Sequence, residues 1–167
     1  MFRKSLAVAL AVFTLALGGC DIGVRADASK AIARFLTAVH NDDRKAFEAG
    51  IDREALRADL RAQLTDLARA KGVVVEGGPS EFALDRMISP GAFRLVEAGT
   101  GQALHVAPNA AALALIMQVR DRSHVCVGDP AKPHCALSFA KQDGVWRLVG
   151  MQATDRKIAV PPAPAKK

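Results

Sequence analysis

The sequence predicts an α+β fold in which four or five N-terminal helices pack on a C-terminal three-stranded antiparallel sheet. Two observations predict it. Between Ile32 and Val39, apolar residues recur at the spacing of one helix face, and similar stripes follow behind capping residues. Near the end of the chain, an Asp143-Gly144 pair separates two apolar runs, which is a strong signal for a two-residue hairpin.

Three helices are expected before Gly72. The first spans Ala28–His40 behind a cap at Asp27 or Ser29, and the second is short, carries Phe47 and ends at Gly50. The third is capped by Asp52 and ends near Lys71, ahead of Gly72. Leucines line one face of this third helix, which is therefore expected to be buried: Leu56, Leu60, Leu64 and Leu67.

The middle of the chain predicts shorter elements. They are an extended piece over Val73–Val75, a segment capped by Ser80 that includes Met87, a helix from Ser89-Pro90 to Gly99, and a helix over Ala110–Arg120 behind Asn109. A strand is the alternative over Leu115–Met117, because those residues are large and apolar.

Three strands are expected at the end of the domain: His124–Val127, Cys135–Lys141 and Val145–Ala153. The hairpin turn sets the register and places Phe139 opposite Leu148 and Lys141 opposite Trp146. Since side chains alternate across a strand, one face collects residues that the helices should cover. These residues are Cys135, Leu137, Phe139, Trp146 and Leu148.

The opposite face of this sheet is unusually apolar for a face in contact with water. It carries Ala136, Ala140, Val145, Val149 and Met151. A large apolar surface is usually covered, so we expect another helix, a partner or a ligand there. Val145, Val149 and Met151 are the candidate ligand or partner face.

The start of the chain predicts export. Met1–Lys4 is a positive head, and Ser5–Leu17 is an uncharged apolar run that is too short to span a bilayer. Small residues then lead to Cys20, which completes the layout of a secretory signal. Gly18 and Gly19 also weaken helix at this point.

The stretch Leu15–Cys20, Leu-Ala-Leu-Gly-Gly-Cys, resembles the lipobox of bacterial lipoproteins. The resemblance implies diacylation of the Cys20 thiol, cleavage before it and acylation of the new amine. Residues 1–19 would then be signal peptide, and residues 20–27 a lipidated tether that anchors the protein stably in a membrane. Asp21 favours the periplasmic face of the inner membrane over the outer membrane. The alternative is an ordinary secretory signal with Cys20 as an incidental thiol.

Residues 28–153 are expected to form a single domain that resembles the bacterial domain of unknown function numbered 2939. The resembling motifs are Ala31 to Val39, Asp42-Asp43 with Ala46-Phe47, Ile51 to Leu64, Leu84 to Phe93, and Gly144 to Leu148. The resemblance implies an envelope protein, and it brings no known activity or catalytic residue. The order of helices and sheet is also similar to cone-shaped nuclear-transport-factor-like folds. Residues 154–167 are expected to be a disordered Pro/Ala/Lys tail.

Composition limits the partners. The net charge is +6, but no run of Lys and Arg is interleaved with aromatic residues, so nucleic acid is not an expected partner. Weak attraction to anionic lipid headgroups is expected for a tethered basic domain. Aromatic residues make up 5% of the chain and none is Tyr, which disfavours a large aromatic binding platform.

Cys126 and Cys135 are expected to form a disulfide, because export places them in an oxidising compartment. The bridge would close a short loop and contribute about 3 kcal/mol or less. His124 and His134 lie close by in sequence, so a metal site is an alternative, as are free thiols. Adjacent residues on a strand point to opposite faces, which argues against His134 and Cys135 sharing a metal ion.

Several carboxylates could serve as acid and base: Asp42, Asp43, Asp52, Glu54 and Asp59. Each lies at an expected helix start or on a solvated face, so capping explains most of them. The sequence therefore predicts a non-enzymatic envelope lipoprotein that needs no cofactor and binds a protein partner or an apolar ligand. The alternatives are a small hydrolase or isomerase with an apolar cone-shaped pocket, and a metal-handling lipoprotein in which His124, Cys126 and His134 converge.

Overall fold

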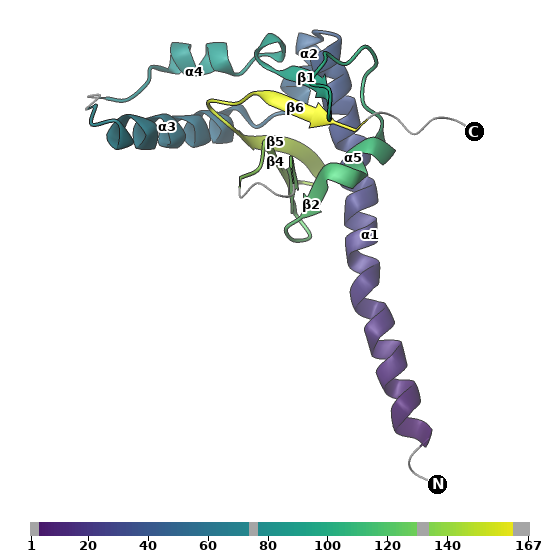
Figure 1. Ribbon diagram of the computed structural model, residues 1–167. Helices are drawn as coiled ribbons and strands as arrows, with labels where there is room; N and C mark the ends of the chain where they lie inside the picture. The colour runs from purple at the N-terminus through teal and green to yellow at the C-terminus, as the bar shows by residue number, and fades with distance from the viewer. Residues whose placement is uncertain (1–3, 74–76, 130–133, 162–167) are drawn as a thin grey trace.

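The computed structural model describes residues 4–73, 77–129 and 134–161, and it confirms the α+β class (Figure 1). The helices are α1 (Lys4–His40), α2 (Arg44–Ala49), α3 (Arg53–Ala70), α4 (Glu81–Met87), η1 (Pro90–Ala92) and α5 (Ala110–Ile116). The strands are β1 (Arg94–Glu97), β2 (Met117–Val119), β3 (His124–Val127), β4 (Leu137–Gln142), β5 (Val145–Met151) and β6 (Lys157–Val160). The expected extended piece Val73–Val75 lies largely outside the described residues.

Helix α1 is longer than predicted and passes through the Leu15–Cys20 motif without a break. Figure 1 shows its N-terminal part projecting away from the other elements. Among the side chains described from residue 21 on, Val24 is the first apolar one to pack on the core, and Ala28 and Ile32 are fully buried. The segment expected to be a tether, residues 20–27, is therefore helical, and part of it is docked on the domain.

The predicted caps of the later helices are confirmed. In each, a side-chain oxygen accepts the backbone N–H three residues on, at the start of α2, α3, α4 and α5: Asp43, Asp52, Ser80 and Asn109. Asp27, which we expected at a helix start, instead lies inside α1. It accepts hydrogen bonds from the Lys141 ammonium (2.7 Å) and the Trp146 indole N–H (3.0 Å). These bonds, that of Lys141 foremost, lower the pKa of Asp27 and tie α1 to the hairpin.

An aromatic cluster joins the helices to the sheet. Phe35 of α1 lies at ring-centroid distances of 5.4 Å from Phe47, 6.1 Å from Phe93 and 5.5 Å from Phe139. Four of the residues that we expected the helices to cover are buried: Leu137, Phe139, Trp146 and Leu148. The prediction is wrong for Cys135, which precedes β4, is half-buried and lines a groove outside the core. The core thus lies between α1, α2 and one face of the sheet.

The antiparallel sheet has four strands, in the order β2-β3-β4-β5, rather than three. The predicted register is confirmed, with Phe139 opposite Leu148 and Lys141 opposite Trp146. The extra strand is β2, which forms where the expected helix over Ala110–Arg120 ends early, at Ile116. The alternative strand over Leu115–Met117 is confirmed only at Met117, because Leu115 and Ile116 remain in α5.

A bulge in β5 changes the face on which its last residues lie. Phe139 pairs with Leu148, but Ser138 pairs with Gly150, so Val149 is an extra residue on β5. The shift turns Met151 toward the core beside Leu137, where it is 3% exposed. The prediction that Met151 lies on the outer face is therefore wrong, because one inserted residue inverts the alternation beyond it.

The segment from Pro90 to Gly99, expected as a helix, is a single 3-10 turn followed by β1. Strand β1 pairs in parallel with β6, which lies inside the stretch expected to be a disordered tail. Three apolar residues of the two strands are buried, and their burial holds β6 on the domain: Leu95, Ile158 and Val160. In the part of the chain that the structure describes, no helix is long and apolar enough to cross a membrane.

Candidate functional site

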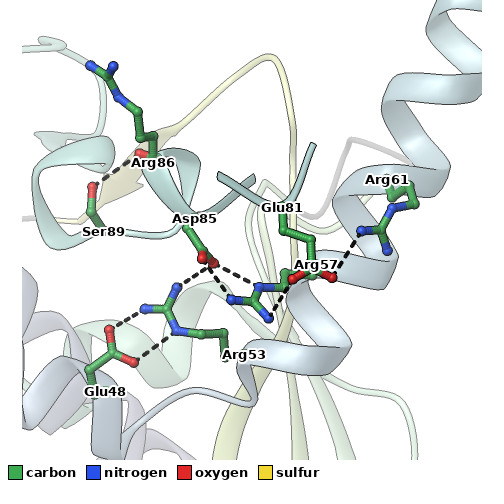
Figure 2. A network of polar contacts seen from close by, with 8 residues as sticks. All are labelled: Glu48, Arg53, Arg57, Arg61, Glu81, Asp85, Arg86 and Ser89. Carbon is green, nitrogen blue, oxygen red and sulfur yellow. Dashed lines mark hydrogen bonds and ion pairs between the residues drawn. The ribbon is translucent and has the colours of Figure 1, made fainter. Parts of the chain in front are cut away.

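A charged network holds α4 against α3 (Figure 2). The Asp85 carboxylate accepts two hydrogen bonds from the Arg57 guanidinium, at 2.8 and 2.7 Å, and one from Arg53 at 2.9 Å. The bonds from Arg57, and after them those from Arg53, outweigh partial burial and lower the pKa of Asp85. Such paired bonds fix orientation as well as distance, so they set how α4 lies on α3.

The same network reaches α2 and the start of α4. Glu48 of α2 accepts hydrogen bonds from Arg53, and Glu81 of α4 lies 3.5 Å from Arg57 and 3.8 Å from Arg61. Ser89 donates to the backbone carbonyl of Arg86 at the end of α4. Arg53 and Arg57 of α3 thus form ion pairs that connect α3 with α2 and α4.

An apolar groove with a volume of about 480 Å³ lies along the second half of α3. It is lined by Leu64, Thr65, Ala68, Arg69, Gly72, Val73, Gly78 and Pro79. Val73, one of the lining residues, is 53% exposed. Apolar surface of this kind around a groove of this size is typical of a binding site for an apolar ligand or chain segment.

The ligand face that the sequence predicts does not form. Val145 is 48% exposed beside the hairpin turn, Val149 is half-buried at the bulge, and Met151 is in the core. An apolar groove forms along α3 instead, and we did not predict it. Its signal in the sequence was the run from Leu64 to Gly72, but a leucine stripe on a helix is expected to be buried.

The free edge of β5 is covered by side chains of α3. Asp59 accepts the Met151 N–H at 3.0 Å, and Gln63 both donates to the Met151 carbonyl at 2.8 Å and accepts the Ala153 N–H at 3.0 Å. Gln63 also donates to Asp59 at 2.8 Å. Two side chains thus occupy the place of a neighbouring strand, which closes an edge that could otherwise pair with another chain.

This edge borders a second, more polar groove of about 760 Å³, whose lining includes Asp59, Gln63, His134, Ser138 and Thr154. Burial raises the pKa of the Asp59 carboxyl, and the hydrogen bonds from Met151 and Gln63 offset this only in part. Of the carboxylates considered as acid and base, Asp43 and Asp52 are helix caps. Asp59 is the member of this set whose pKa is raised, and its Oδ2 atom accepts hydrogen bonds from the Met151 N–H and the Gln63 amide.

Asp59→Asn is expected to keep both hydrogen bonds, since the amide oxygen still accepts them, and to remove the cost of a buried charge. Because the pKa of Asp59 is higher in the folded state than in the unfolded chain, that cost is fully present at neutral pH. It disappears as the pH falls through the folded pKa to below the unfolded value of about 3.9. Urea unfolding should therefore show the variant to be at least as stable as the wild type at pH 7, with the difference lost in acid. A variant that is less stable at neutral pH would contradict this role.

The sulfur atoms of Cys126 and Cys135 lie 2.12 Å apart, with their Cα atoms 5.3 Å apart, which bears out the expected disulfide. Nearby, His124 lies 3.0 Å from Asp121 and 3.1 Å from the Ser123 hydroxyl. The N–H and hydroxyl of Ser123, followed by His124, lower the pKa of Asp121 to about 2. Among the described residues, no three His, Cys, Asp or Glu side chains converge as a metal site would require.

Cys126→Ser is expected to lower the melting temperature in oxidising buffer and to have little effect in reductant. The bridge closes a short loop, so the expected loss is about 3 kcal/mol or less. Thermal unfolding of wild type and variant, each with and without reductant, measures this. A loss of equal size in both buffers would mean that packing of the sulfur, rather than the bond, stabilises the fold.

Fold and site together define a small α+β domain that is carried on a long N-terminal helix and has an apolar groove on α3. Searches with the chain find no match among protein-family models, curated proteins or solved structures. The likeness to the domain family numbered 2939 stays a prediction from the sequence.

Proposed function

We propose that this protein is a non-enzymatic envelope lipoprotein, anchored through Cys20, that binds an apolar ligand or an apolar segment of a protein partner. The observation that carries the proposal is the place where α1 starts to pack. From residue 21 on, where the side chains are described, Val24 is the first apolar residue of α1 that packs on the core, four residues after Cys20. Cleavage before Cys20 would remove the part of α1 that projects from the domain in Figure 1 and would leave the buried residues in place.

We propose that the protein lies at the periplasmic face of the inner membrane, because Asp21 directly follows the anchored Cys20. An exported domain would also meet the oxidising conditions that the Cys126–Cys135 bond needs. The binding role rests on the groove along α3, because a monomer in water rarely leaves apolar surface of this extent uncovered.

Ala68 lines the groove, whereas Ala62 is exposed on the same helix and is not part of the lining. An apolar dye that becomes fluorescent on burial should bind the wild type, and its affinity should fall at least about tenfold in Ala68→Glu, since a buried unpaired charge costs more than about 1.4 kcal/mol. Ala62→Glu adds the same charge to α3 and should bind the dye like the wild type. Equal binding by all three proteins would place the dye elsewhere and contradict the role of the groove.

A small pocket enzyme is the second candidate function, and the observation that favours it is the raised pKa of Asp59 in a polar groove whose lining also includes His134. The bonds from Met151 and Gln63 give Asp59 a structural task instead, which is why we rank this candidate lower. A screen for hydrolase activity with the wild type and Asp59→Asn tests this candidate: activity in the wild type that the folded variant lacks would support it, and a wild type without activity would contradict it.

A further inference from the structure

The short distance between Cys20 and the packed part of α1 fixes how the domain can sit on a membrane. Only residues 21–23 separate Cys20 from Val24, and all four residues from 21 to 24 are helical. At about 1.5 Å per residue, the anchor lies only about 6 Å along the helix axis from the first core contact. A lipid on Cys20 would therefore hold one end of the domain against the headgroups, without a flexible spacer.

That end of the domain is formed by α5, β2 and the turn after β2. The Arg25 guanidinium donates to the carbonyl oxygens of Ala114 at 2.7 Å and of Met117 at 2.5 Å, so the end of α5 lies close to the anchored end of α1. Strand β2 also contacts α1. Figure 1 shows the turn after β2 on the same side of the domain as the projecting part of α1.

This end exposes apolar and basic side chains. Ile22 is 72% exposed and Leu115, next to Ala114, is 73% exposed. Ile22 and Arg25 are three residues apart, so they share the face of α1 that looks toward α5. The turn adds the exposed Arg120 and Arg122, while the Asp121 carboxylate between them accepts hydrogen bonds from Ser123. Apolar side chains beside cations match the boundary between acyl chains and anionic headgroups.

We propose that Ile22, Leu115 and the turn Arg120–Ser123 form a second membrane contact, which docks the lipidated domain on anionic phospholipid and fixes its orientation. This inference rests on the proposed lipid anchor at Cys20. Docking in this way would leave α2, which follows the far end of α1, facing away from the membrane.

The test uses the lipidated protein in vesicles of phosphatidylethanolamine and phosphatidylglycerol. A polarity-sensitive fluorophore is attached to Leu115→Cys, because acylation of Cys20 and the Cys126–Cys135 bond leave the added cysteine as the reactive thiol. The control carries the fluorophore at Lys45→Cys, an exposed position on α2. We expect emission at shorter wavelength, and quenching by a headgroup-labelled nitroxide lipid, for the label at position 115 and not for the label at position 45.

The charge requirement is tested in the same protein. Arg120→Gln with Arg122→Gln should weaken docking about thirtyfold, since each cation near an anionic surface is worth about 1 kcal/mol. The matched control is Arg44→Gln with Lys45→Gln on α2, which removes the same charge from the far end of α1 and should leave the label at position 115 quenched. Equal quenching in both double variants would contradict a role for the two arginines of the turn.

The outcomes separate the two proposals. A lipidated, membrane-bound protein whose label at position 115 stays in water, like the label at position 45, would overturn the membrane contact and leave the anchor standing. A protein whose mass shows no acyl chains on Cys20 would overturn the anchor and the contact together.

Discussion

Loss of the Cys20 thiol is expected to move the protein from the membrane to the soluble envelope fraction. The substitution is Cys20→Ala, made in a chain whose residues 1–19 are replaced by an ordinary cleavable secretory signal so that the uncleaved signal cannot act as an anchor. Without acyl chains, only weak surface contacts remain, and these do not hold a protein on a membrane through a high-salt wash. Fractionation of washed membranes, followed by detection of the protein, measures the change.

The matched control is Cys126→Ala with the native signal, which removes a different cysteine and should stay in the membrane fraction. Retention of the Cys20→Ala chain in salt-washed membranes would show that something other than a lipid on this residue holds the protein there.

The second large effect is expected in the aromatic cluster. Phe47→Ala should lower the free energy of unfolding by about 3–5 kcal/mol, because the side chain is 0% exposed and its removal leaves a cavity beside Phe35 and Phe93. Denaturant unfolding of the purified protein measures the loss.

Phe82→Ala removes the same atoms from a side chain that is 73% exposed, and it should change stability by no more than about 0.5 kcal/mol. Similar losses in the two variants would mean that α2 does not pack on α1 and the sheet as described.

Local signals were enough to predict much of the fold. Capping by Asp43, Asp52, Ser80 and Asn109 involves residues three apart, so the helix starts could be found from sequence alone. The Asp143-Gly144 turn likewise determined the register of β4 and β5 near the turn, because the pairing follows directly from a two-residue connection.

The features that could not be predicted depend on contacts between distant parts of the chain. Strands β1 and β6 pair although most of the second half of the chain lies between them in sequence. Parallel strands are not joined by a short turn, so no local turn signal predicts their pairing. The bulge at Val149 lies beside α3, whose Asp59 accepts the Met151 N–H just after it. A two-residue repeat cannot show where one residue is inserted, and this is why Met151 was placed on the wrong face.

The features of the candidate site also separate into those that the sequence predicts and those that depend on contacts between distant residues. The disulfide could be predicted, since the signal-like start of the chain predicts an oxidising compartment and the two cysteines lie in neighbouring expected strands. The groove on α3 could not, because a stripe of leucines indicates burial, and only the packed structure shows that Leu64 lines a groove and that Leu67 is 37% exposed. The ties from Arg53 and Arg57 to Asp85 were also hidden, since the acid is about thirty residues further along the chain and no local rule pairs them.

Anchoring, location and orientation all depend on the chemistry at Cys20, and the intact mass of the protein extracted from its native membranes tests that chemistry directly. We expect a polypeptide that begins at Cys20 and carries two or three acyl chains on that residue. A mass that corresponds to an uncleaved start, or to a free Cys20 without acyl groups, would contradict the anchor and the orientation derived from it.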